Sequence, residues 1–229
     1  MLIAEDLLLL VTDDASGRLT AAGEQVDIGL AGANLLELAL LNKVDLSGDR
    51  DGGRPGRLVV RDSTPTGDAV LDEALGQVAE HQGDKPATVL RPLSRDLRRR
   101  LYQRLAGTGV LRAEDGRILG IFPTHRWPAR NANHEAQVRR DLVQALVEGT
   151  TPDARTAALI ALTHALRCEE KAVDAKDHSL TKRELRARAA QIANGDWASA
   201  AVRTAIDQMT AAVVAATSSA VVLSGGTHG

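Results

Sequence analysis

The sequence predicts a mainly α-helical protein, a single-domain helical bundle around a central apolar helix, decorated with short β-hairpins. Hydrophobic residues make up 44% of the 229 positions but aromatic residues only 2%, so Leu, Ala and Val must fill the core. Leu and Ala favour helices, and apolar residues recur at helical spacing in several segments. A chain of this length can bury roughly 70–75% of its unfolded surface, which is enough for one domain over residues 1–229.

The first segments predict a helix, a loop and a second helix. Residues 3–11 are short and apolar, which indicates an opening helix. Polar residues and a Ser-Gly turn signal predict a small loop or hairpin over 12–23. Residues 25–42 predict a long helix, and its apolar positions cover more than one face, so we expect it at the centre. Turn-rich residues between 44–46 and 57–61 predict a β-hairpin with a long, mobile tip.

The segment TPTGDAVLDEAL, residues 64–75, carries the signals of a helix start. Thr64 can act as an N-cap, and Pro65 suits a first helical position because an N–H there needs no helical partner. Asp68 places a negative charge near the positive end of the helix dipole. We expect the helix to end near residue 82 and to bury the positions at helical spacing, Leu71, Ala74, Leu75 and Val78.

The middle of the chain predicts a helix, a hairpin and a connector. Ser94 is the expected N-cap of a helix over 94–106. The following residues, GVLRAEDGRILGIFP, form two β-prone runs around Asp115-Gly116, which is a hairpin signal. Residues 123–133 then form an irregular connector.

Helices dominate the C-terminal part, predicted over 134–148, 153–168, 179–193 and 196–223, with a flexible tail over 224–229. The second of these contains AALIALTHAL, which is apolar on nearly all sides, so we expect it in the middle of the bundle. The weakly polar run from Met209 to Leu223 has 15 residues, short of the ~20 that span a bilayer.

Composition and motifs limit the function classes. The net charge of −2 argues against a polycation, so any anion site must be a local patch. The single cysteine, Cys168, excludes an intramolecular disulfide and suits a reducing cytosol, and no N-terminal signal is predicted. The motifs GxSxG, HExxH and GxxxxGKS/T are missing, and the histidines do not pair at metal-ligand spacing, so we expect no enzyme, metal or cofactor. His164 is interpreted as a hydrogen-bonded core residue, with a Cys168–His164 nucleophile as the alternative.

The arginines are the most informative charges. Guanidinium groups bind phosphate oxygens in bidentate fashion, so a cluster in and after the connector suits a phosphorylated headgroup. A tryptophan beside it offers an amphipathic ring for a membrane interface. Acids interleave with these arginines, so a solvated surface of salt bridges is the alternative. The candidate anion-binding residues are Arg126, Trp127, Arg130, Arg139 and Arg140.

A second group, Arg95–Arg104, crowds one predicted helix. A helix followed by a hairpin resembles the end of a winged-helix module, in which the helix would enter the major groove of DNA and the hairpin would touch the backbone. The negative net charge and the lack of a basic face beyond this helix weigh against that function. A nucleic-acid-binding protein therefore remains the alternative hypothesis.

The sequence resembles the Golgi phosphoprotein 3 family over nearly its whole length. The resemblance implies a mostly helical domain with small hairpins, no catalytic activity, and peripheral attachment to a membrane through a phosphoinositide-like headgroup. It further implies a bacterial member that is cytoplasmic and peripheral on the inner membrane face. The matching segments are IAEDLLLLVTDDASGRL, GLAGANLLELALLNKVDL, TPTGDAVLDEAL, RRRLYQRLAGTGVLRAEDGRILGIFPTHRWP and AALIALTHAL.

The headgroup residues of the family are only partly kept. By resemblance, the family's tryptophan before the first core helix corresponds to Ala22, and the arginine within its GL-x-G motif to Ala31. Of the later basic pair, Arg139 matches one member and Ala136 the other, with Arg140 adjacent. An apolar hairpin of the family corresponds to a polar stretch here. The resemblance therefore implies an adaptor whose ligand is another anionic lipid or a protein.

Overall fold

The computed structural model describes residues 1–48, 51, 54–118, 122–173, 180–194 and 207–218. Residues 207–218 are helical. The other elements, in chain order, are α1 (Ile3–Leu10), α2 (Gly23–Leu40), β1 (Val44–Leu46), β2 (Leu58–Val60), α3 (Ala69–Glu80), α4 (Pro86–Ser94), α5 (Leu97–Gly107), β3 (Glu114–Ile118), β4 (Phe122–Arg126), α6 (Asn133–Leu146), α7 (Ala154–Ala165), α8 (Glu169–Ala172) and α9 (Lys182–Ala193).

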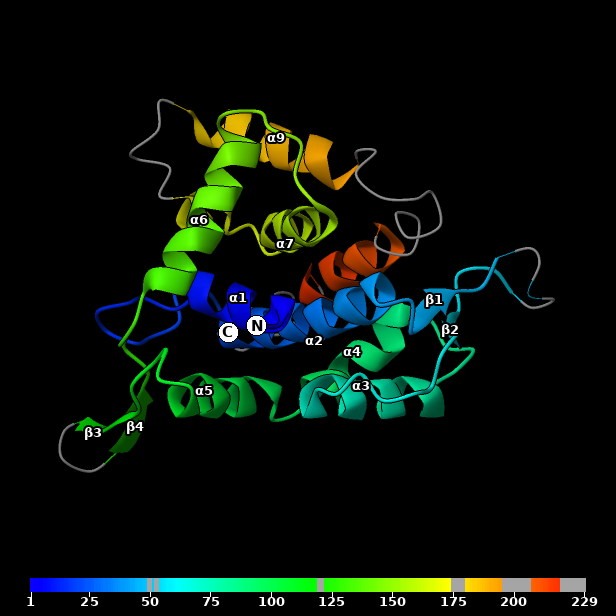
Figure 1. Ribbon diagram of the computed structural model, residues 1–229, viewed down its shortest axis with the longest axis horizontal. Coiled ribbons are helices and arrows are strands. Elements are labelled where there is room, and N and C mark those ends of the chain that lie inside the picture. The colour runs from blue at the N-terminus through cyan, green and yellow to red at the C-terminus, as the bar shows by residue number, and fades with distance from the viewer. Residues whose placement is uncertain (49–50, 52–53, 119–121, 174–179, 195–206, 219–229) are drawn as a thin grey trace, which may run out of the picture.

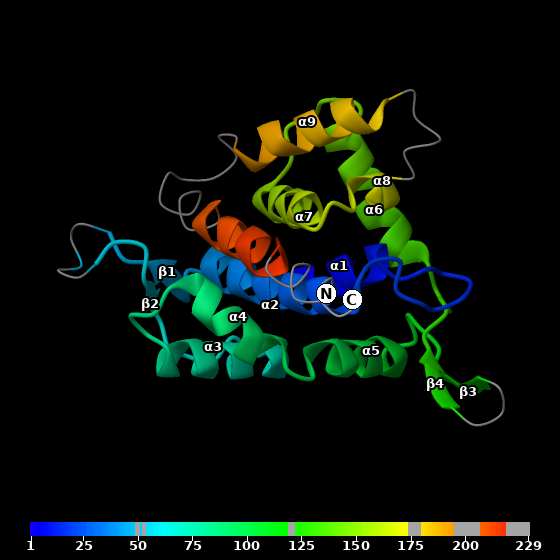
Figure 2. The ribbon, with the colours of Figure 1, turned by 180° about the vertical axis from the view of Figure 1, so that it is seen from behind.

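The helices lie in three tiers around α2 (Figures 1 and 2). Helices α3, α4 and α5 form one outer tier, α1 and α2 the middle tier, and α7 and α9 the other outer tier, in which α7 is packed between α2 and α9, as expected for an apolar helix in the interior. Helix α6 runs from α9 to α1 at one end of the bundle, and α2 contacts both outer tiers through α4 and α7. Strands β1 and β2 pair antiparallel, as do β3 and β4, in two separate sheets. The predicted mainly helical fold with short hairpins is confirmed.

Helix α2 occupies the centre because small residues let its neighbours approach. A Cβ added at Gly29 would lie 2.6 Å from Leu166 Cδ1, and one at Gly32 would lie 2.4 Å from Val213 Cγ2. Glycine at these positions therefore allows α7 and the 207–218 helix to pack directly against the α2 backbone. The expectation that this helix is central, drawn from its apolar positions on several faces, is confirmed.

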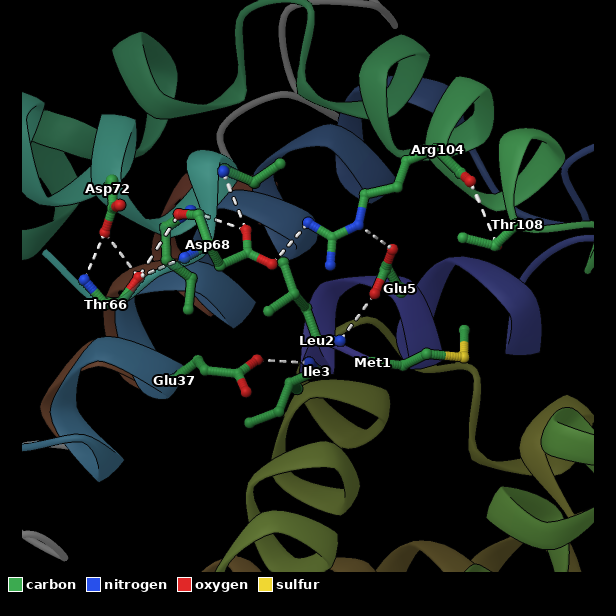
Figure 3. A network of polar contacts seen from close by, with 12 residues as sticks. Met1, Leu2, Ile3, Glu5, Glu37, Thr66, Asp68, Asp72, Arg104 and Thr108 are labelled. Carbon is green, nitrogen blue, oxygen red and sulfur yellow. Dashed lines mark hydrogen bonds and ion pairs between the residues drawn. The ribbon is translucent and has the colours of Figure 1, made fainter.

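Helix α1 is fully buried although it carries two acids, Glu5 and Asp6, which are only 2% and 3% exposed. The Glu5 carboxylate accepts the Leu2 backbone N–H at 2.8 Å and meets Arg104 Nε of α5 at 2.9 Å (Figure 3). Arg104 also reaches Asp68, at 2.6 Å. A charge buried with hydrogen-bonded partners of opposite sign is tolerable, whereas an unpaired one is not.

The second acid ties α1 to the other side of the bundle. Asp6 accepts from Arg155 Nη2 of α7 at 2.8 Å and contacts His134 Nε2 of α6 at 2.7 Å. Arg155 Nη1 donates to Glu37 of α2 at 2.8 Å, and the other oxygen of Glu37 accepts the Ile3 N–H. Burial disfavours the Arg155 charge, but the two carboxylates outweigh that effect and raise its pKa. The acids of α1 therefore join helices from all three tiers.

The third helix begins later than predicted. Its N-cap is Asp68, whose side chain accepts from the N–H of Val70 at 2.9 Å and of Leu71, so Thr64 and Pro65 lie before the helix. An aspartate with this geometry satisfies two of the orphan N–H groups, which makes it the stronger start signal. The predicted apolar face is confirmed, because Leu71, Ala74, Leu75 and Val78 are all buried.

The helix predicted over 94–106 with Ser94 as its N-cap is wrong at its start. Ser94 ends α4, a helix that the sequence analysis missed and that begins at Pro86. Arg95 is extended and Asp96 has a φ of 55°, so the chain turns there before α5 starts. Pro92 lies inside α4. Because a proline usually breaks a helix, the sequence pattern did not predict this short helix.

The second hairpin forms, but Asp115-Gly116 is not its turn. Both residues lie in β3, where Asp115 pairs with His125 and Gly116 with Thr124. Val110, in the first predicted β-prone run, does not join the hairpin. Its N–H donates to the Leu105 carbonyl at the end of α5, at 2.9 Å. Residues 119–121, between the two strands, lie outside the described residues.

The C-terminal helices follow the prediction where they are described. Helices α6 and α7 match the predicted 134–148 and 153–168, and α9 starts later than expected, after the N-cap Thr181. Helix α8 was not predicted. Of the helix expected over 196–223, residues 207–218 are helical, while the remainder and the tail over 224–229 lie outside the described residues. None of the described helices is both long and apolar enough to cross a membrane.

We expect Arg155→Ala to lower the free energy of unfolding by about 2–4 kcal/mol, because it removes the cation shared by the buried Asp6 and the partly buried Glu37. The matched control is Arg91→Ala, which removes an exposed pair with Glu24 and should cost less than about 1 kcal/mol. Urea unfolding followed by circular dichroism measures both. Equal losses in the two variants would contradict the importance of the α1 network.

Candidate functional site

The candidate residues before α6 do not share one environment. Arg126 ends β4, and its Nε is buried without a hydrogen-bond partner in the described part of the chain. Trp127 is half-buried, and its ring stacks on Tyr102 of α5 at 5.1 Å between centroids with an interplanar angle of 2°. Arg130 is exposed. The tryptophan therefore fixes the connector to α5, and one face of its ring is covered.

The loop after α1 holds the connector from the other side. The Trp127 N–H donates to the Gly17 carbonyl at 3.1 Å, and the Ala129 N–H to the Asp14 carbonyl at 2.9 Å. Gly17 has a φ of 63°, and a Cβ there would lie 2.2 Å from Trp127 N. Only glycine satisfies both the left-handed backbone and this close approach. The loop and the connector therefore form one unit.

Arg139 is the candidate residue that borders a cavity and is held by several hydrogen bonds. Its Nε and Nη2 donate to one oxygen of Glu135, at 2.9 and 2.6 Å, and its Nη1 donates to the Lys171 carbonyl of α8. Glu135 is 3% exposed. Burial raises the pKa of Glu135 to about 7, although Arg139 acts against this, and Asp14 adds to the rise.

Two adjoining cavities lie next to Arg139. The smaller, of about 400 Å³, is bordered by the loop after α1, Arg139 and Lys171. The larger, of about 470 Å³, lies between the start of α2, the end of α7, α8 and the 207–218 helix, and it includes Arg167 and Lys171. Both share Thr20 and Lys171, so they adjoin at these residues. Arg139 thus borders the smaller cavity, Arg167 the larger, and Lys171 both.

Acids offset these cations in the smaller cavity. Asp13 and Asp14 line it, and the pKa of Asp13 is lowered by its hydrogen bonds to Ser16. The Lys171 ammonium donates to the Thr20 carbonyl at the cavity wall. Arg167 is exposed and lines the larger cavity, where none of the described lining residues is a carboxylate. The larger cavity is therefore the more cationic of the two.

The remaining sequence candidates lie outside the lining of these cavities. Arg140 is exposed and donates to Gln137 at 2.6 Å, and neither it nor Arg126, Trp127 or Arg130 borders either cavity. Sequence reasoning missed Lys171 and Arg167. No spacing rule connects them to Arg139, because the fold brings α7 and α8 beside α6 only in three dimensions.

The positions taken from the resemblance have different surroundings. Ala22 lines the larger cavity as the N-cap residue of α2. Ala31 is fully buried within α2, and Ala136 is half-buried on α6. The small side chain at Ala22 leaves the cavity open at the start of α2.

The Arg95–Arg104 group does not form a free basic face. Arg98 pairs with Asp27 at 3.2 Å, Arg99 with Asp96 at 3.3 Å and Arg100 with Glu73. The groove beside them, of about 680 Å³, is lined by acids as well as by arginines. A DNA-binding helix would present its cations to phosphates, so nothing in this geometry supports the winged-helix hypothesis.

His164 of α7 and Cys168, the N-cap residue of α8, have other partners. His164 Nδ1 contacts Glu169 at 2.7 Å, as expected for a hydrogen-bonded residue, but its side chain is 30% exposed and does not lie in the core. Burial raises the pKa of Cys168 to about 12, so the nucleophilic thiolate is scarce at neutral pH. Among the residues with described positions, no cluster of three His, Cys, Asp or Glu side chains is suited to a metal ion.

Comparison with known proteins decides the family. The model of the family described as Golgi phosphoprotein 3 (GPP34) matches residues 3–209, which is most of the chain. The chain belongs to the Golgi phosphoprotein 3 family. It is also 28% identical over 211 residues to vacuolar protein sorting-associated protein 74 of Eremothecium gossypii, with 77% of this chain and 62% of that protein covered. The chain thus spans less than two thirds of the length of this relative.

The GPP34 match extends over every element that builds the candidate site, from α1 to α9 and the start of the 207–218 helix. The resemblance inferred from the sequence is therefore confirmed. The identity of the ligand does not follow from family membership, because the side chains at the site decide it.

We expect Gly17→Ala to destabilise the protein by about 2–4 kcal/mol, because a Cβ adds a clash with the connector to the cost of a left-handed backbone. Gly109→Ala is the control. Gly109 has a φ of 76° with nothing near its Cβ position, so only the backbone cost of about 1 kcal/mol applies. Urea unfolding gives both values, and a Gly17 variant as stable as the Gly109 variant would contradict the close contact.

Proposed function

We propose that this protein is a non-enzymatic, peripheral membrane adaptor that binds an anionic, phosphorylated headgroup in the two adjoining cavities beside α6 and α8. The observation that carries the proposal is that Arg139 borders the smaller cavity, Arg167 the adjoining larger one, and Lys171 both. Guanidinium and ammonium groups form charge-assisted hydrogen bonds with phosphate oxygens. The proposed site works from the cytoplasmic side of the membrane.

The start of α2 supports an anion at this place. Ala22 and Gln25 border the larger cavity, and Ala22 offers no side chain to cap the helix. The first N–H groups of an 18-residue helix and its dipole favour a negative charge there. The hydroxyl groups of Thr20, Thr217 and Ser218 in the same lining each donate to a backbone carbonyl, so they would reach an anion only by giving up these hydrogen bonds.

Family membership supports the adaptor role. The family is named for a Golgi phosphoprotein, and the name of the relative associates it with protein sorting. Both names fit a protein that links membranes with other proteins rather than one that catalyses a reaction. Arg130 and Arg140 are exposed on the connector and α6, where they add positive charge near a bound membrane. The proposed partners are an anionic lipid and a sorted protein.

The donors at the cavities favour a ligand with several acceptor oxygens. Asp13 and Asp14 repel any anion at close range, and this repulsion grows with the charge of the anion as the attraction to Arg139 and Lys171 does, so the number of oxygens that the donors can reach decides the preference. A phosphomonoester carries close to two charges at neutral pH and three acceptor oxygens. We therefore propose a phosphomonoester headgroup over a phosphodiester lipid.

We expect Lys171→Ala and Arg167→Ala each to weaken binding to phosphoinositide vesicles roughly tenfold, because each removes one charge-assisted contact. Arg99→Ala is the control, since it removes an exposed arginine of α5 and should leave the affinity unchanged. Co-sedimentation with phosphoinositide, cardiolipin and neutral vesicles measures these effects. Binding should weaken as salt increases.

The absence of binding to any anionic vesicle at low salt would overturn the membrane function. The protein would then be a scaffold that binds only proteins. Equal binding to phosphoinositide and cardiolipin vesicles would contradict the proposed preference for a phosphomonoester.

A further inference from the structure

Glu135 is a buried acid that the proposed anion site does not use. It lies in the first turn of α6, where its charge favours the helix dipole, but it is almost inaccessible to water. Its oxygen Oε1 accepts two N–H groups of Arg139, from Nε and Nη2. An external phosphate would use the same edge of the guanidinium group. The carboxylate thus occupies the place of an anion on Arg139.

The charge of Glu135 is incompletely compensated. Arg139 is its single cationic contact among the described residues, and that guanidinium also donates to the Lys171 carbonyl. From the loop after α1, Asp14 faces Glu135 and raises its pKa further, so the two acids oppose each other's ionisation. The neighbouring His134 is directed to Asp6. Burial dominates, and the pKa of Glu135 reaches about 7.

We propose that Glu135 is an internal competitor for the anion site, so that an external anion binds Arg139 with uptake of one proton by Glu135. This inference rests on the proposed function, because it requires an anion in the cavities. The anion displaces the carboxylate from the guanidinium edge, and the proton neutralises the displaced, buried acid. The protein therefore binds the anion more tightly at mildly acidic than at alkaline pH.

The direction of the pH effect distinguishes this coupling from titration of the ligand. A phosphomonoester loses its second charge as pH falls through about 6, which weakens its binding at low pH. Proton uptake by Glu135 acts in the opposite direction. Above the pKa of Glu135, one coupled proton lowers the affinity about tenfold for each pH unit, and below it the affinity is constant.

The experiment compares wild type, Glu135→Gln and Arg139→Ala between about pH 6 and pH 8.5. Vesicles with a sulfated glycolipid serve as the first probe, because a sulfate does not titrate in this range. Phosphoinositide vesicles and free inorganic phosphate serve as the second and third probes, which separate a lipid headgroup from a soluble anion. Glu73→Gln is the matched control, since it removes the same charge from an exposed residue of α3 that is paired with Arg100.

We expect the wild type to lose about tenfold or more in affinity across this range, and Glu135→Gln to bind about tenfold more tightly than the wild type at the alkaline end with no pH dependence. Calorimetry in two buffers at the alkaline end should show uptake of about one proton by the wild type and none by Glu135→Gln. Arg139→Ala should bind weakly throughout, and Glu73→Gln should match the wild type. A pH dependence that persisted in Glu135→Gln would show that another group takes up the proton and would overturn the role of Glu135.

Each failure has a distinct meaning. Binding by wild type and Glu135→Gln with the same affinity and the same pH profile would overturn the role of Glu135 and leave the proposed function intact. Failure of every folded variant to bind any probe at any pH would overturn the proposed function, and the inference with it. Circular dichroism of each variant confirms that it is folded.

Discussion

The fold depends on keeping two charged carboxylates inside the bundle. Helix α1 is completely buried, and its Glu5 and Asp6 would be untenable there without partners. Arg104 from one outer tier and Arg155 from the other supply them, and each arginine holds a further acid, Asp68 or Glu37. Such ion pairs add little net stability compared with apolar packing, but removing one partner is costly. The network therefore specifies which helices surround α1 more than it strengthens the core.

The position of the candidate site follows from this constraint. Once α1 is fixed, the loop after it lies against the connector through the backbone bonds of Gly17 and Asp14. Asp6 also contacts His134 at the start of α6. This contact helps to position α6, the helix that contains Arg139. The Lys171 ammonium of α8 donates to the Thr20 carbonyl, and these two residues border both cavities. The cavities are therefore built on the same loop and helix that the buried acids hold in place.

Sequence periodicity predicted the elements whose apolar faces are long and regular, and it failed where a single polar contact decides the boundary. Residues 25–42 and 153–168 were recognisable because apolar positions repeat over several turns. The start of α3 depends on the side-chain bonds of Asp68, and the turn before α5 on the left-handed Asp96. Arg139 was predicted as a site residue, but Lys171 and Arg167 were not, because long-range packing leaves no local pattern. The burial of Glu5 and Asp6 was likewise invisible, since acids near a helix start usually face solvent.

The contrast between the two sets of buried acids explains why Glu135 is the functional candidate. Asp6 contacts Arg155 and His134. Glu5 contacts Arg104 and accepts the backbone N–H of Leu2, the N-cap residue of α1. Glu135 has one arginine, which it shares with a carbonyl, and an opposing carboxylate nearby. The acids of α1 thus have partners on two sides, whereas the charge of Glu135 is only partly compensated. Buried groups that lack full compensation occur mainly at functional sites. An incompletely paired acid whose arginine borders a cavity can take up a proton when an anion binds that arginine, whereas the paired acids of α1 hold the helices together.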